Sequence, residues 1–148
     1  MTAPDERRAR IVVGVDGSDR SKDALRWAAR QAELTGATLE AVAAWHRPGA
    51  SGLVAANPGE LDLPKLAEQT LTHVIDDLFG TDHPAWLRTR AVEGHAAQVL
   101  VDASAGADLL VVGSHGRGRF VTALLGPVSN HCVHHARCPV TVIRLRQP

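Results

Sequence analysis

Short apolar runs that alternate with segments of helical periodicity constrain the fold of this chain more than any other feature. Nearly continuous apolar runs occupy residues 11–16, 108–113 and 139–144, and a weaker run covers residues 38–45. Strands that are apolar on both faces are typical of parallel sheets covered by helices on both sides. Residues 86–92 alternate only in part, so we expect this strand to lie nearer an edge of the sheet.

Segments with an apolar period of 3.6 residues lie between these runs. We expect helices over residues 21–35, 61–78, 96–105 and 122–136. Ser18 or Asp19 is a suitable N-cap for the first helix, and Gly36 is a suitable stop. The resulting β-α-β-α-β-α-β-α-β order predicts an α/β fold with right-handed crossovers between parallel strands. The Gly- and Pro-containing stretch 46–59 is expected as a surface loop.

Length and composition exclude several classes of protein. A chain of 148 residues fits a single domain over residues 1–148, with a core over about 10–146. Its 16 basic and 16 acidic residues give a formal net charge of zero, which argues against a nucleic-acid partner and against a polybasic membrane anchor. The sequence shows no signal peptide, no apolar run long enough to span a membrane and only two cysteines. We therefore expect a cytoplasmic protein with reduced thiols.

Two strand ends carry groups that suit an anion. The first expected strand is followed by Asp16 and Gly17, and the fourth by residues 113–119, GSHGRGR. Sheets of this type bind ligands outside the carboxyl ends of their strands. The glycines allow several backbone N–H groups to face one anion, and Arg117 and Arg119 add positive charge. With a helix N-terminus near Gly126, the pattern predicts a phosphate cradle, and a plain flexible turn is the alternative.

The glycine-rich segment matches neither of two common phosphate-binding motifs. No Gly-Lys-Ser/Thr follows it, as a Walker A loop requires, and residues 14–17 lack the G-x-G-x-x-G spacing of dinucleotide-binding proteins. The chain also lacks the G-x-S-x-G elbow of serine hydrolases. The sequence therefore identifies no catalytic residue.

Three segments together resemble the universal stress protein family. Residues 11–18 (IVVGVDGS) resemble its first strand, and residues 108–116 (DLLVVGSHG) its fourth strand and nucleotide loop. Residues 130–143 (NHCVHHARCPVTVI) resemble its last helix and final strand. The resemblance covers about residues 10–144. It implies a Rossmann-like five-stranded parallel sheet of order 3-2-1-4-5 with helices on both faces, and a binding or regulatory role in the stress response.

ATP-binding members of that family carry the motif G-x₂-G-x₉-G-(S/T). In this chain Pro127 stands at the Ser/Thr position. Proline offers neither an N–H nor a hydroxyl to a phosphate, but it is well tolerated as the first residue of a helix. We expect adenine-nucleotide binding to be retained. The expected site joins the ends of two strands, the loop and the start of the last helix: Gly14, Val15, Asp16, Ala44, Gly113, Ser114, His115, Gly116, Arg117, Gly118, Arg119, Gly126, Pro127, Val128 and Ser129.

The resemblance also implies roles for single residues. Asp16 would face the ribose or a phosphate-bound metal, Mg²⁺ with ATP, while Val15 and Ala44 would approach the adenine. Asp16 has a second explanation as a cap of the following helix. His115 either senses the phosphates or is a solvent-exposed loop histidine.

Two other functions stay open on the sequence. A dimeric interaction protein of the same family that binds no nucleotide is favoured by Pro127, and a weak Mg-dependent ATPase would use Asp16. The final run, which begins with Pro139 and ends with Arg144, is expected at a sheet edge, where the family forms homodimers by antiparallel pairing.

A zinc site in the last helix is a weaker possibility. Three histidines and a cysteine have the spacing of one helical face, and imidazole and thiolate are zinc ligands: His131, His134, His135 and Cys138. A packed helix with one buried and one exposed side explains the same pattern without a metal.

Overall fold

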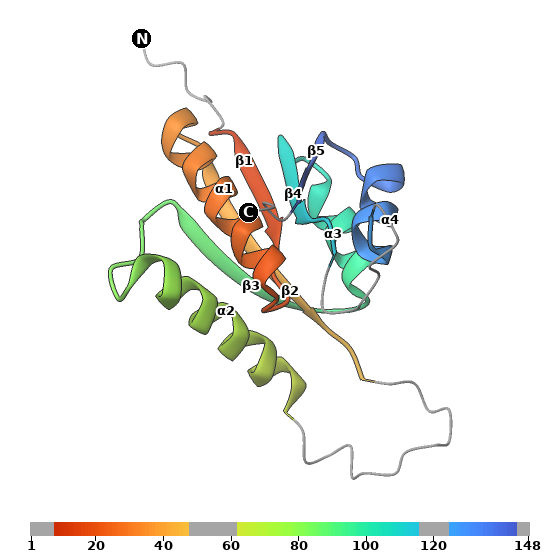
Figure 1. Cartoon of the computed structure of the whole chain (residues 1–148), viewed down its shortest axis with the longest axis horizontal. Helices are drawn as coiled ribbons and strands as arrows, with labels where there is room; N and C mark the ends of the chain where they lie inside the picture. Colours follow the sequence, from red (N-terminus) through yellow and green to blue (C-terminus); the bar gives the residue numbers. More distant parts are fainter. Residues whose placement is uncertain (1–7, 48–61, 116–124, 145–148) are drawn as a thin grey trace.

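Strand β1 is the centre of a five-stranded parallel sheet whose order is β3-β2-β1-β4-β5. The computed structural model describes residues 8–47, 62–115 and 125–144 (Figure 1). The elements follow each other along the chain as β1 (Arg10–Gly14), α1 (Asp19–Thr35), β2 (Thr38–Trp45), α2 (Leu63–Phe79), β3 (Leu87–Glu93), α3 (Ala96–Ser104), β4 (Leu109–Gly113), α4 (Pro127–His135) and β5 (Val140–Ile143).

The sheet topology confirms the predicted strand order and the predicted positions of the two edge strands. In the centre of the sheet Val13 is level with Ala41 of β2 and with Val111 of β4. The partly alternating strand β3 lies at one edge, and β5 lies at the other. All four strand pairings are parallel, so the carboxyl ends of the strands meet at one edge of the sheet.

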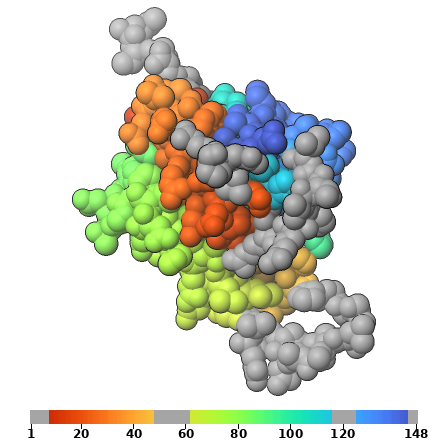
Figure 2. All heavy atoms as spheres, in the orientation of Figure 1, coloured from red at the N-terminus to blue at the C-terminus, as the bar shows by residue number. Residues whose placement is uncertain are grey.

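Each face of β1 is buried under a separate helical layer. Val13 belongs to the core formed with α1 and α2, whereas Val12 belongs to the core formed with α3 and α4. Neither side chain has any solvent exposure. In the space-filling view α1 and α2, orange to yellow-green, lie on one flank, and the C-terminal elements, in blue, lie on the other (Figure 2). Among the described residues no helix is both long and apolar enough to cross a membrane.

Local capping interactions explain where the first helix begins and ends. The Oγ of Ser18 accepts a hydrogen bond from the N–H of Ser21 at 3.2 Å, which makes Ser18 rather than Asp19 the N-cap. Gly36 ends the helix with a φ of +74°, a left-handed conformation that favours glycine. Both features confirm the sequence prediction.

The last helix begins later than residue 122, where the periodicity predicted its start. Gly126 is extended, with φ −74° and ψ 173°, and Pro127 is the first helical residue. Residues 122–124 lie outside the described part of the chain. Proline fits this position because its fixed φ is helical and the N–H it lacks would have no partner within the helix.

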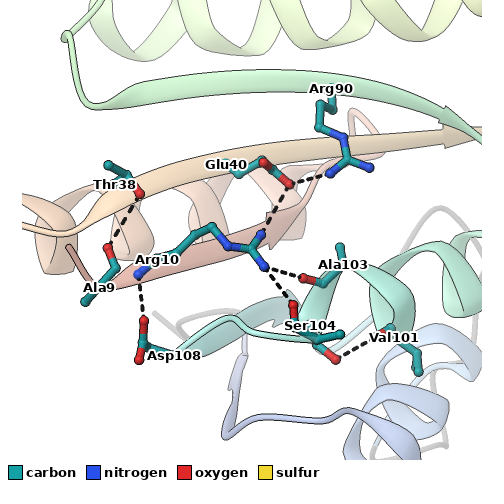
Figure 3. Close-up of polar contacts among 10 residues, drawn as sticks. Ala9, Arg10, Thr38, Glu40, Arg90, Val101, Ala103, Ser104 and Asp108 are labelled. Atoms are coloured by element: carbon teal, nitrogen blue, oxygen red, sulfur yellow. Dashed lines mark hydrogen bonds and ion pairs between the residues drawn. The ribbon is translucent and has the colours of Figure 1, made fainter. Parts of the chain in front are cut away.

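Arg10 joins the amino ends of three strands to the end of α3 (Figure 3). Its Nη2 donates hydrogen bonds to the carbonyl oxygens of Ala103 at 3.1 Å and Ala105 at 2.9 Å. Its Nη1 lies 3.6 Å from Oε1 of Glu40, and its backbone N–H donates to Oδ2 of Asp108 at 2.8 Å. A guanidinium at this place satisfies carbonyls that the C-terminus of a helix leaves without partners.

We expect Arg10→Met to lower the free energy of unfolding by about 1–3 kcal/mol, the usual effect of removing charge-assisted hydrogen bonds. The aliphatic part of the side chain is kept, so the loss reports on the guanidinium. Urea unfolding measures the change. Arg26→Met is the matched control, because the ion pair of Arg26 with Asp23 lies on the surface and contributes little. Equal unfolding midpoints for the two variants would contradict this role of Arg10.

Candidate functional site

The carboxyl ends of β1, β2 and β4 open into a cleft that reaches the N-terminus of α4. Its empty volume is about 570 Å³, including space open to solvent. One wall is apolar and comes from the strand ends and two helices: Val15, Val42, Ala44, Ala96, Leu100, Val112 and Val128. The rest of the lining is polar or glycine: Gly14, Asp16, Ser21, Gly113, His115 and Ser129. The cleft thus places an apolar wall beside a carboxylate and a helix N-terminus.

Most of the described residues of the expected site line this cleft. Eight of them contribute to its lining: Gly14, Val15, Asp16, Ala44, Gly113, His115, Val128 and Ser129. Ser114, Gly126 and Pro127 lie next to the lining residues in sequence but do not line the cleft. Gly116, Arg117, Gly118 and Arg119 lie outside the described residues. The assignment of these residues to a ligand stays a prediction.

Two motif glycines are required by close packing around them. A Cβ on Gly113 would lie 3.0 Å from Cβ of Arg20 and 3.1 Å from its backbone carbonyl carbon and oxygen. A Cβ on Gly126 would lie 3.2 Å from Cα of His115 and 3.3 Å from the carbonyl oxygen of Ser114. A Cβ at either position would therefore force its neighbours to shift by a few tenths of an ångström.

A hydrogen-bonded link holds the end of β4 against the start of α4. The Oγ of Ser129 donates to the carbonyl oxygen of Ser114 at 2.8 Å, and the N–H of Gly126 donates to the same oxygen at 2.6 Å. Ser129 is only 2% exposed. Because this interaction uses the Ser129 hydroxyl proton, the hydroxyl does not replace the donor that Pro127 lacks.

The free donors of α4 are backbone N–H groups. Gly126 provides no side-chain cap, and Pro127 has no N–H. The N–H groups of Val128 and Ser129 lie in the first turn, where a helix offers them no internal acceptor. An anion at this end of the cleft would meet these two donors and the positive end of the helix dipole.

Asp16 has a local structural role and also lines the cleft. Its Oδ1 accepts a hydrogen bond from the N–H of Ser18 at 2.9 Å, while Ser18 itself caps α1. The alternative role of Asp16 as the helix cap is therefore wrong, although its carboxylate does order the turn before the helix. His115 is half-buried rather than solvent-exposed, and its Nδ1 lies 3.3 Å from Oγ of Ser114.

A second cavity adjoins the cleft and shares Val15, Asp16 and Ala44 with it. It continues along β2 and the first turns of α2, where it is lined by Trp45, His46, Leu63, Leu66, Ala67 and Thr70. The lining residues that α1, α2 and α3 contribute to the two cavities were missed in the sequence, because they appeared there only as positions of amphipathic helices. The signal that could have found them is topological: in a parallel α/β sheet the helices begin at the edge where the strands end.

The described residues contain no cluster of three or more His, Cys, Asp or Glu side chains that could hold a metal ion. The predicted zinc spacing does not occur on one helix, since α4 ends at His135 and Cys138 lies beyond it. The rings of His131 and His135 lie against each other with centroids 4.4 Å apart and their planes tilted by 39°.

Neither thiol is activated as a nucleophile. Burial raises the pKa of the Cys132 thiol from 9.0 to about 11. The pKa of Cys138 is also raised, chiefly by burial, with Asp108 adding to the shift and Arg10 opposing it. Both thiols therefore stay protonated at neutral pH, unlike the thiolates of redox enzymes.

Cys132 makes stability depend on alkaline pH. Its pKa is higher in the folded chain, so its contribution is fully present below about pH 9 and is lost as the pH rises toward about 11. We expect the free energy of unfolding to fall by about 2–3 kcal/mol over this interval. Urea midpoints from pH 8 to 11 measure the fall, and the chain has no tyrosine to titrate there. The free energy of unfolding of Cys132→Ala should be lower at pH 8 and should fall less steeply with rising pH. Parallel pH curves for the two proteins would show that Cys132 is not the cause of the fall.

Comparison with known proteins gives one family. The model described as the universal stress protein family matches residues 8–144. Universal stress protein Rv2623 of Mycobacterium tuberculosis is 39% identical over 141 residues, which are 90% of this chain and 46% of that protein. This chain spans about half the length of the curated relatives that it matches.

Solved structures of similar proteins share the fold. The universal stress protein UspA from Lactobacillus plantarum superposes with a TM-score of 0.72 at 27% identity, covering 95% of this chain and 100% of that one. A universal stress protein in complex with cAMP superposes with a TM-score of 0.69 at 26% identity, covering 91% of this chain and 96% of that one. These matches and the observed strand order confirm the predicted Rossmann-like architecture.

Proposed function

Because this chain belongs to the universal stress protein family, we propose that it binds an adenine nucleotide in the cleft at the carboxyl ends of β1, β2 and β4. One observation carries the proposal: the cleft joins an apolar wall to the carboxylate of Asp16 and to the N-terminus of α4. These three parts match the three parts of a nucleotide, which are an apolar base, a ribose with hydroxyl donors and an anionic phosphate. The cAMP complex of a 26% identical family member supports the same class of ligand.

Each part of the nucleotide has a proposed set of contacts. The base packs on the apolar wall near Val15 and Ala44, and the Asp16 carboxylate accepts from the ribose hydroxyls. The phosphates meet the N–H groups of Val128 and Ser129 together with the glycine-rich loop, from which Arg117 and Arg119 contribute positive charge. When Mg²⁺ accompanies ATP, Asp16 is the carboxylate that would face it.

We propose ATP as the ligand, held less tightly at its distal phosphates because of Pro127. The loss of one hydrogen bond to a phosphate weakens binding about tenfold to a hundredfold. The Ser129 hydroxyl does not compensate, since it donates to Ser114. The sequence carries neither a Walker A loop nor a serine-hydrolase elbow, so we propose a cytoplasmic binding or regulatory module for the stress response rather than an enzyme.

Calorimetry with ATP and Mg²⁺ tests this proposal. We expect the wild type to bind, Pro127→Ser to bind about tenfold to a hundredfold more tightly, and Asp16→Asn to bind about tenfold more weakly. Asp23→Asn is the matched control, because Asp23 lies on the outer surface of α1 and pairs with Arg26. Its affinity should equal that of the wild type.

Two outcomes of this experiment point to other functions. Binding that occurs only in Pro127→Ser would indicate an interaction protein that binds no nucleotide. Turnover of ATP by the wild type well above that of Asp16→Asn would indicate a weak Mg-dependent ATPase.

We also propose a homodimer in which two β5 strands pair antiparallel about a two-fold axis. The carbonyl oxygens of Pro139 and Ile143 accept hydrogen bonds from β4. Because successive residues of a strand point their polar groups to opposite sides, Val140 and Val142 direct theirs away from the sheet. An apolar edge with such unpaired groups favours pairing with a second chain.

Substituting Val142→Pro tests the dimer without disturbing β4. The change removes an N–H that points outward, and proline is tolerated on edge strands. We expect a Kd of about 10 µM, which corresponds to roughly 7 kcal/mol of association. Sedimentation velocity should therefore show mainly dimer for the wild type at about 100 µM, well above this Kd. The variant should be a monomer with an unchanged circular dichroism spectrum. A wild type that stays monomeric up to several hundred µM would exclude the proposal.

A further inference from the structure

A third cavity, here called the basic cavity, lies at the amino ends of the strands, on the opposite edge of the sheet from the nucleotide cleft. It is lined by Arg8, Arg10, Thr38, Arg88, Gly106 and Asp108, and its empty volume is about 660 Å³, including open space. Arg10 and Thr38 begin β1 and β2, and Arg88 lies near the start of β3. Arg8 precedes β1, and Gly106 and Asp108 lie between α3 and β4. The basic cavity shares no residue with the cleft. We propose that it binds a small phosphate-bearing anion.

One of its three guanidinium groups is fixed by the fold. Arg10 is held by the carbonyl oxygens of Ala103 and Ala105 and by Glu40, so its position does not depend on a ligand (Figure 3). The single carboxylate of the lining, Asp108, is also fixed, since its Oδ2 accepts the backbone N–H of Arg10. The floor of the cavity is therefore preorganised, which lowers the entropic cost of binding.

Among the described residues, the other two guanidinium groups of the lining, Arg8 and Arg88, have no anionic partner. Within the described part of the chain, neither Arg8 nor Arg88 forms an ion pair or a side-chain hydrogen bond. Arg90 differs, although it lies on the same face of β3 as Arg88: its Nη1 is 3.0 Å from Oε1 of Glu40. The lining thus carries three guanidinium groups and one carboxylate. Because Arg10 is also paired with Glu40, the excess of positive charge rests on Arg8 and Arg88.

Protection of an edge strand does not account for this arrangement. Arginines on β3 alone would discourage pairing with another chain, as charged residues on edge strands do. Arg8 and Arg10, however, come from β1 and the residues before it, near the middle of the sheet. Arg88 is exposed, while α2 packs on the opposite face of β2 and β3. A ligand therefore has access from the side of β3 that faces α3.

The chemistry of the lining identifies the class of ligand. Guanidinium groups bind phosphate oxygens through paired hydrogen bonds and remain charged at any physiological pH. The guanidinium groups of Arg8 and Arg88 lie in the same cavity as the fixed guanidinium of Arg10. Together they suit a ligand that carries several anionic oxygens. A single carboxylate would leave one guanidinium without a partner, so phosphate is favoured.

Nuclear magnetic resonance of the full ¹⁵N-labelled chain, titrated with sodium pyrophosphate at constant ionic strength, tests the proposal. We expect saturable shifts of the backbone amides of Thr38, Gly106 and Asp108. Arg88→Gln and Arg8→Gln should each weaken this binding about tenfold to a hundredfold, the effect of one charge-assisted interaction. Arg26→Gln, which removes an equal charge on α1, should leave it unchanged.

The location of the shifts separates this proposal from the nucleotide site. Pyrophosphate bound in the cleft would shift the amides of Gly113 and Val128 instead. Shifts confined to those residues, equal affinities for Arg88→Gln and Arg26→Gln, or linear shifts without saturation would each overturn the basic cavity as a binding site. Saturable shifts at the amino edge that persist with the cleft filled by ATP would support it.

Discussion

Burial of β1 on both faces is the constraint on which the rest of the structure depends. Val12 and Val13 are successive residues, and both are fully inside, one in each core. A strand that contributes two such side chains has to lie between two helical layers, because neither face can meet water without losing about 25 cal/mol for each Å² of apolar surface. Its neighbours on either side are parallel, so every loop that leaves a strand end opens at the same edge.

The parallel arrangement gives the two edges of the sheet opposite electrostatic character. Helices begin near the carboxyl ends of the strands, where their N–H groups attract anions, and end near the amino ends, where their carbonyls attract cations. Arg10 at the end of α3 follows this rule. The cleft proposed for the nucleotide would bind phosphate through the backbone N–H groups of α4 together with the arginines of the glycine-rich loop, whereas the basic cavity would bind it through side-chain charge alone.

The elements could be predicted from the sequence because each has a local cause. Apolar runs marked the strands, and the Ser18 cap and the left-handed Gly36 marked the ends of α1. The contacts of Arg10 with Glu40 and with the end of α3 could not be predicted, since they join positions 30 or more residues apart with no periodic pattern. The site was predictable where glycines and Asp16 follow strands, but not where Leu66 or Leu100 only continue a helical stripe.

The contact of Arg10 with Asp108 also has a consequence for the order in which the chain folds. These residues are 98 positions apart, and the guanidinium contacts of Arg10 with α3 span 93 and 95 positions. The centre of the sheet therefore cannot be completed until more than two thirds of the chain is available, although β1 is the first strand made. Contacts of such long range slow folding, and during synthesis β1 can pair with β2 well before β4 exists to cover its other edge.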